Sequence, residues 1–133
     1  CWLADGSGKL VWKNSVRTYV PSLLVLSNHL FTVTDDGIAY LWKKETGEEV
    51  WKQRLGGKFS ASPILANGHI YASSETGTTW VLKPEGAGVN VISKNQLGTG
   101  HMSTPAFSGK QVFLRVIDET SGEHRERLVC VQQ

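Results

Sequence analysis

The chain has 133 residues and a formal net charge of +2 at pH 7. This length is enough for one domain with a sizeable core. The charge is too small to suggest a nucleic-acid-binding surface, and no basic stripe alternates with aromatic residues. No apolar run approaches the ~20 residues that a membrane span needs. Fourteen glycines and five tryptophans, in a chain rich in Val, Leu and Thr, favour an all-β fold.

The two cysteines stand near the two ends, at Cys1 and Cys130. Three interpretations of Cys1 stay open: a cleavage boundary, which we favour, the acylated first residue of a bacterial lipoprotein, or half of a disulfide with Cys130. A lipid anchor normally precedes a flexible spacer, whereas Cys1 runs directly into Trp2 and Leu3. Spacing alone does not establish a disulfide. We expect both residues to be small core thiols.

A repeat runs along the whole chain, because Pro21, Pro63 and Pro105 follow one another at intervals of 42 residues. After each proline come an apolar stretch, a polar turn and a second apolar stretch. Turns such as Asn67-Gly68 between apolar runs predict β-hairpins, since these residues readily adopt positive φ. A second turn, as at Asp35-Asp36-Gly37, leads to a third strand. In the last repeat the charged segment Asp118 to Arg127 replaces that turn, and we expect a long solvated hairpin loop there.

The fourth element of the repeat joins a glycine turn to a tryptophan four residues later. Gly8 precedes Trp12 and Gly47 precedes Trp51, whereas the third copy places Ile92 four residues after Gly88. Burying an indole ring removes about 150–250 Å² of surface from water. Each Å² of buried apolar surface stabilises a fold by about 25 cal/mol. We therefore predict a structural docking role for Gly8, Trp12, Gly47 and Trp51.

A repeat of about 40 residues with four short strands is typical of a β-propeller blade. A β-sandwich would not repeat its proline at equal spacing, and the coils of a solenoid are usually shorter. We expect four-stranded antiparallel blades: the end of one blade over 1–15, blades over 16–54 and 55–97, and an incomplete last blade over 98–133. Closed propellers need about 4–8 blades. The chain is therefore either part of a longer protein, which we favour, or a unit whose copies complete the ring as a homo-oligomer.

Two segments carry a family resemblance. Leu41 to Trp51 resembles the tryptophan-docking repeat of PQQ-like propellers, and Leu55 to Pro63, with the Tyr19-Val20-Pro21-Ser22 run, resembles the final blades of BamB-like proteins. The resemblance implies an exported bacterial protein, periplasmic or at the cell surface, with a non-catalytic scaffold or binding role. The alternative is a fragment of a quinoprotein dehydrogenase whose PQQ and calcium ligands lie elsewhere, since no adjacent cysteines or carboxylate set is recognisable. We expect no cofactor under the favoured interpretation, and no nucleic-acid partner.

One aligned set of residues suggests a ligand site. Four residues before each repeat proline stand Arg17, Phe59 and His101, and their neighbours include Tyr19, Lys58 and Met102. In a propeller these positions lie where one blade crosses to the next, near the central channel. Their chemistry suits an anionic or ring-bearing ligand or an acidic peptide, so a protein or a small ligand is expected at this face. Variable loop residues are the competing interpretation.

No catalytic or metal site is expected. His29 and His69 occupy equivalent turns one blade apart, which makes shared metal binding improbable. His124 lies in a charged run and is expected to be exposed. The acidic residues fall in turns, where we expect them to be solvated: Asp35, Asp36, Glu45, Glu48 and Glu49.

Overall fold

A computed structural model describes residues 2–132, which form thirteen β-strands and no helix. The bounds of the strands, in chain order, are β1 (Trp2–Ala4), β2 (Leu10–Lys13), β3 (Leu24–Leu26), β4 (His29–Val33), β5 (Ile38–Lys43), β6 (Glu49–Arg54), β7 (Ile64–Ala66), β8 (His69–Ser73), β9 (Thr78–Glu85), β10 (Gly88–Gln96), β11 (Ala106–Ser108), β12 (Gln111–Asp118) and β13 (Arg125–Gln132). Within these described residues there is no helix that could cross a membrane.

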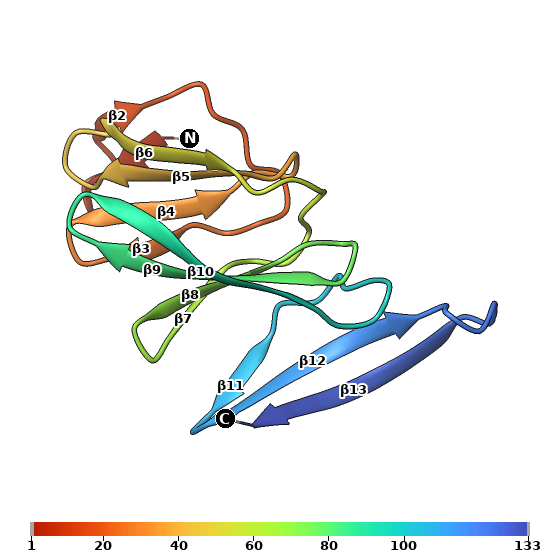
Figure 1. The fold of residues 1–133 in the computed structure, drawn as a ribbon. Helices are drawn as coiled ribbons and strands as arrows, with labels where there is room; N and C mark the ends of the chain where they lie inside the picture. Colours follow the sequence, from red (N-terminus) through yellow and green to blue (C-terminus); the bar gives the residue numbers. More distant parts are fainter. Residues whose placement is uncertain (1, 133) are drawn as a thin grey trace.

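The strands form four sheets in which chain neighbours pair antiparallel. The β1–β2 pair comes first, followed by the four-stranded sheets β3–β6 and β7–β10 and the three-stranded sheet β11–β13. The prediction of an all-β chain of four-stranded antiparallel blades is confirmed. In Figure 1 the sheets β3–β6 and β7–β10 lie face to face, whereas β11–β13 diverges from its neighbour.

The hairpin turns explain why these short strands form. Ser27 and Asn67 have positive φ (44° and 50°) in the turns before β4 and β8, and Gly109 (56°) has it before β12. Such turns match the twist of the strands that they join. The register after each turn places equivalent apolar rows on one face of the sheet. Leu24, Phe31, Leu41 and Trp51 are paired in turn across β3–β6.

The largest core cluster lies between the sheets β3–β6 and β7–β10. Phe31 and Leu41 from the first sheet pack with Ile70 and Leu82 from the second, and all four are buried. Full burial of such side chains stabilises a fold by about 1.5–3 kcal/mol each. A second cluster joins Trp12 of β2 to the opposite face of β3–β6, at Leu30, Tyr40 and Trp42.

The last sheet corrects the expectation of a long loop from Asp118 to Arg127. Asp118 ends β12 and Arg125–Arg127 begin β13, so only residues 119–124 lie outside the strands. Charges paired across the hairpin favour the longer strands: Arg115 Nε donates to Glu126 Oε2 at 3.1 Å, and Arg127 Nη2 lies 3.4 Å from Asp118 Oδ2. Glu126 and Arg127 are exposed, as predicted for the charges of this segment, whereas Asp118 is half-buried.

The expectation that Cys130 is a core thiol is wrong, because its side chain is exposed. Cys130 pairs with Phe113, in a row that is equivalent to Leu41 in β3–β6. In that earlier sheet the next sheet covers the row, whereas nothing within residues 2–132 covers the same face of β11–β13. The interpretations of Cys1 lie outside the described residues.

Candidate binding face

The crossover segments that contain Phe59 and His101 are each hydrogen-bonded to a turn of the preceding blade. The Phe59 amide donates to the Asp35 carbonyl at 3.0 Å, and the His101 amide donates to the Glu75 carbonyl at 3.2 Å. The Glu75 amide donates in turn to the Lys58 carbonyl at 2.8 Å. The crossover segments and these turns therefore form one surface, which we call the crossover face (residues 17–23, 58–62 and 101–104 with Asp35 and Glu75).

Carboxylates of the turns tie the same segments down. Asp35 accepts hydrogen bonds from the Tyr19 amide (2.7 Å) and the Val20 amide (3.1 Å). Glu75 accepts one from the Ser60 hydroxyl at 2.6 Å. Asp35 is therefore a structural acceptor and not merely a solvated turn residue, which corrects the sequence-based expectation.

Hydroxyls placed just before the repeat prolines link the crossover segments to one another. The Ser22 amide donates to Ser62 Oγ at 3.0 Å, and the Ser62 amide donates to Thr104 Oγ1 at 3.0 Å. Each acceptor comes from the following blade. The sequence signal was present in Ser62-Pro63 and Thr104-Pro105, but the sequence did not show where the hydroxyls would point.

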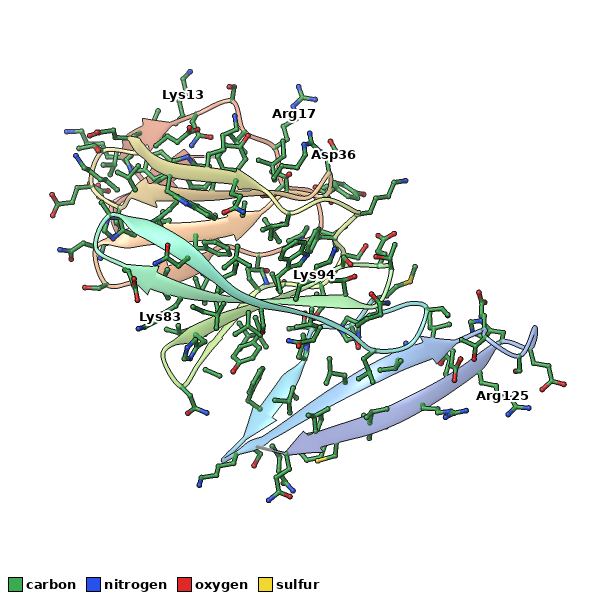
Figure 2. The ribbon with its side chains drawn as sticks, in the orientation of Figure 1. Lys13, Arg17, Asp36, Lys83, Lys94 and Arg125 are labelled. Carbon is green, nitrogen blue, oxygen red and sulfur yellow. The ribbon has the colours of Figure 1, made fainter. Side chains whose placement is uncertain are left out.

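The six aligned residues divide into a buried pair and an exposed set. Phe59 and His101 are 1% and 2% exposed, so their side chains belong to the interior. Tyr19 is 94% exposed and Met102 is 59% exposed. Arg17 and Lys58 are also exposed, and Figure 2 shows Arg17 at the same end of the sheets as Asp36 of the β4–β5 turn. The crossover face thus presents an aromatic ring, a thioether and two cations.

Burial affects the ionisation of His101. Removal of its ring from solvent lowers the pKa of His101 below the usual 6.5. Neither ring nitrogen makes a hydrogen bond of ordinary geometry with the described residues. Backbone groups of Arg115 and Ser103 lie close enough to oppose part of the shift. The ring is therefore neutral at pH 7 and adds no charge to the crossover face.

Trp12 and Gly47 make a close contact between blades. Trp12 Nε1 donates to the Lys44 carbonyl at 2.8 Å, and its indole covers Gly47 so closely that a Cβ there would lie 2.5 Å from the ring. Gly47 also has a φ of +71°, which favours glycine. A Cβ on Gly8, by contrast, would meet none of the described residues within 4 Å.

Trp51 makes the corresponding contact one blade later. Its ring stacks on Phe31 with 6.5 Å between centroids, and a Cβ on Gly88 would lie 3.7 Å from its Cδ1. The docking role of these tryptophans stays a prediction, and their positions against Gly47 and Gly88 are those that such a role requires.

The third copy of this motif differs from the sequence alignment. Trp51 pairs with Leu41 directly after a β-bulge, and Ser93 holds that position opposite Val81 in β10. Ile92 is the extra residue of the bulge and is exposed. Both strands carry a bulge at the same place, with Val50 and Ile92 as the extra residues, so the pairing register makes Ser93 and not Ile92 equivalent to Trp51.

No metal centre is indicated in the described part of the chain, where no three His, Cys, Asp or Glu side chains gather. His69 Nδ1 lies 3.0 Å from the Asn67 carbonyl within its own turn. His124 is exposed and contacts Glu119 at 2.8 Å.

Successive four-stranded antiparallel sheets, linked at one end by crossover segments and stacked through apolar faces, define a segment of a β-propeller. A family model described as outer membrane protein assembly factor BamB matches residues 3–115. The chain belongs to this family. The resemblance to PQQ-like, BamB-like repeats is thereby confirmed.

Solved structures agree on the fold. The crystal structure of BamB from Moraxella catarrhalis aligns with a TM-score of 0.68 and 15% identity, over 83% of this chain and 32% of that one. A chain in the crystal structure of the Mitotic Checkpoint Complex aligns with a TM-score of 0.63 and 18% identity, over 81% of this chain and 33% of that one. The chain thus spans about one third of the length of these proteins. A search of curated proteins finds no match.

Proposed function

We propose that this chain is a non-catalytic, protein-binding part of an exported bacterial β-propeller, and that the crossover face contacts an acidic, extended segment of the partner. One observation carries the proposal. The amides and carboxylates of this face are bonded to one another, while Tyr19, Met102, Arg17 and Lys58 remain exposed. Such a face is rigid in its backbone and presents side chains that can bind a partner.

The chemistry of the exposed side chains supports an acidic partner. Arg17 and Lys58 supply two cations, and guanidinium and ammonium groups both pair with carboxylates. Tyr19 and Met102 supply adaptable apolar contact beside them. Apolar side chains at Val20 and Leu23 extend this surface, since both are exposed. Together these groups favour a peptide that alternates acidic and apolar residues.

The family supports the cellular setting that we propose. The matching model is described as an outer membrane protein assembly factor, which favours export to the periplasm or the cell surface. The scaffold role also accounts for the regular repeats. We propose no bound cofactor. Calorimetric titration with PQQ and calcium is expected to give no binding heat, and saturable heat would favour the quinoprotein alternative.

Self-association is a further part of the proposal. β13 is an eight-residue edge strand, and Leu128 on it is 77% exposed. An open edge of this length is prone to pair with another strand. A homo-oligomer that completes the ring would cover it, and sedimentation velocity of the isolated chain would then show dimers or larger species, whereas a monomer would contradict this part.

Site-specific cross-linking tests the binding face. A photoreactive phenylalanine analogue at Tyr19, in the full-length parent protein in its native cell, is expected to give a discrete cross-linked product that mass spectrometry identifies. The same analogue at Lys83, which is exposed on β9 (Figure 2), is the matched control. Equal cross-linking at both positions would contradict the proposal.

Charge reversal tests the acidic nature of the partner. Arg17→Glu with Lys58→Glu is expected to weaken binding of the cross-linked partner on the order of tenfold, since opposed charges at an interface govern association. Lys83→Glu with Lys110→Glu changes the net charge equally at exposed sites outside the crossover face and is expected to change the affinity less than about twofold. An equal loss in both variants would show a nonspecific charge effect.

A further inference from the structure

A cavity of about 320 Å³ lies between the sheets β7–β10 and β11–β13. Its wall is mainly apolar, with Tyr71 and Val81 on one side and Phe107, Leu114 and Val131 on the other. The rings of Tyr71 and Phe107 approach to 4.6 Å between centroids with an interplanar angle of 51°. The cavity is thus bounded by two aromatic rings, and its volume falls at the lower end of the range of small-molecule sites.

The same interface one blade earlier shows what this space normally contains. Phe31 pairs with Leu41 in the sheet β3–β6, and Tyr71 pairs with Val81 in the same row of β7–β10. Tyr71 is therefore equivalent to Phe31, and Val81 to Leu41. The row ends at Trp51 in one sheet and at Ser93 in the other. At the earlier interface the Trp51 indole stacks on Phe31 and is packed against the core cluster.

The residue at the tryptophan position of β10 is small and already bonded. Asn95 Nδ2 donates to Ser93 Oγ at 3.0 Å, which holds the serine hydroxyl beside the strand. Asn95 and Thr79, the next pair on the same face after Ser93 and Val81, line the cavity and provide polar groups at its margin. An apolar cavity with a few polar groups at its edge suits a flat ring that carries one hydrogen-bond donor.

We propose that this cavity is a binding site for a small planar aromatic molecule of the indole class, which occupies the space that a tryptophan side chain fills at the preceding interface. The cavity lies at the interface between blades that follows the one containing Trp51. Its occupant therefore replaces a side chain that the protein itself supplies at the preceding interface. Apolar cavities made by missing side chains bind rings of matching size. The bound ring contacts Tyr71, Phe107 and Leu114, and its N–H group is directed to Asn95 or Thr79.

Indole itself is the probe. Titration into the isotope-labelled protein is expected to shift the methyl NMR signals of Val81, Leu114 and Val131 saturably, with a Kd on the order of 1 mM. The methyl groups of Val33, buried in the other interface, are expected to stay unchanged. Indole is also expected to raise the Tm as its concentration rises, because it binds the folded state. Linear, unsaturated shifts at all methyl groups would overturn the proposal.

Two tryptophan variants distinguish binding of indole at this site from nonspecific binding elsewhere on the protein. Ser93→Trp supplies the missing ring from within the chain and is expected to weaken indole binding on the order of tenfold or more. Ser121→Trp places the same ring in the exposed loop between β12 and β13 and is expected to leave binding unchanged. If Ser93→Trp fails to fold, Val131→Trp narrows the cavity from the exposed strand β13. Indole binding that is unchanged in a folded Ser93→Trp or Val131→Trp protein would overturn the proposal.

Discussion

The two interfaces on either side of the sheet β7–β10 are built from equivalent rows of residues and differ in how well they are closed. Toward β3–β6, Phe31, Leu41 and Trp51 pack into a continuous core. Toward β11–β13, the corresponding Tyr71 and Val81 line a cavity, and the row that they share ends at Ser93. Correct strand register is therefore not enough to bury an interface between blades.

The closed and the open interface also differ in whether the next sheet has a fourth, outer strand. Trp12 contacts Gly47 and Trp51 contacts Gly88, and both glycines stand beside the turn that leads to the fourth strand of the next sheet. In the described residues β11–β13 has no fourth strand to offer such a turn. The preceding sheet correspondingly carries Ser93 and not a tryptophan. The indole ring and the outer hairpin thus occur together in this chain.

The largest expected effect contrasts two equivalent rings. Phe31→Ala empties a fully buried site and is expected to lower the free energy of unfolding by about 3–5 kcal/mol. Tyr71→Ala, at the half-buried equivalent beside the cavity, is expected to cost about 1–2 kcal/mol. Urea denaturation followed by circular dichroism measures both. Equal losses would show that the two interfaces are equally closed.

Trp51→Ser copies the second interface into the first. Loss of the indole that stacks on Phe31 is expected to lower the free energy of unfolding by about 2–4 kcal/mol. This is less than the loss expected for a fully buried tryptophan, because the Trp51 ring is only partly buried. Added indole is expected to restore part of the lost Tm, and benzoate, which carries a charge, is the matched control without effect. A cost below about 1 kcal/mol would contradict the docking role of Trp51.

Gly47→Ala and Gly8→Ala separate ring contact from backbone strain. Both glycines have positive φ, at +71° and +83°, but only Gly47 lies beneath an indole ring. Gly8→Ala is expected to cost about 1 kcal/mol from conformation alone. Gly47→Ala is expected to cost about 2–3 kcal/mol because Trp12 must also move. Equal costs, measured by thermal or urea denaturation, would remove the case for docking at Gly47.

His101 gives the crossover between the last two blades a dependence on pH. Its pKa is lowered in the folded protein by burial, so below about pH 6.5 the unfolded chain binds a proton that the folded chain does not. The free energy of unfolding therefore falls as the pH drops from about 6.5 toward the folded pKa, by up to about 1.4 kcal/mol for each unit between the two pKa values.

A pair of variants isolates that effect. His101→Asn is expected to reduce the loss of stability as the pH falls below about 6.5 in urea denaturation. The pKa of His124 is raised by hydrogen bonds to Glu119 and Glu126, so its contribution is present below about pH 6.5 and is lost as the pH rises through the folded pKa. His124→Asn is therefore the control with the opposite sign. An unchanged acid limb in His101→Asn would contradict the prediction.

The smallest effect is expected at Cys130, on the face of β11–β13 that no other sheet of residues 2–132 covers. Cys130→Ser is expected to change the stability by less than about 0.5 kcal/mol because the side chain is exposed. In the monomer the native thiol is expected to react with a thiol reagent as fast as it does in urea, whereas a homo-oligomer that completes the ring is expected to protect it. Protection of the thiol in the native protein would show that a second copy or another segment covers this face.

Much of the fold could be predicted because proline spacing and glycine turns are local signals. The hairpins at Ser27 and Asn67 follow from residues that adopt positive φ. Side-chain direction was harder to predict. The spacing from Gly88 placed Ile92 at the tryptophan position, whereas Ser93 lies there. Gly88 is already paired with Glu85 in β10, while β6 begins only at Glu49, two residues after Gly47, and the glycine spacing does not reveal this difference.

The candidate site was predicted only in part for a related reason. Equal spacing placed Phe59 and His101 in crossover segments, but spacing does not reveal which side chains turn inward. Their amides are held by Asp35 and Glu75 of the preceding blade, and this fixes the segments so that both rings are buried. Long-range pairing of this kind depends on the assembled sheets and has no local signal.

The hydrogen bonds of the crossover segments also bear on how such a chain can change its length over evolution. Phe59 bonds to Asp35, and His101 bonds in the same way to Glu75, each in the immediately preceding repeat. Since every repeat recognises only its neighbour, duplication or deletion of one whole 42-residue unit leaves each remaining bond with an equivalent partner. The number of blades can therefore change by gene duplication without the invention of a new contact.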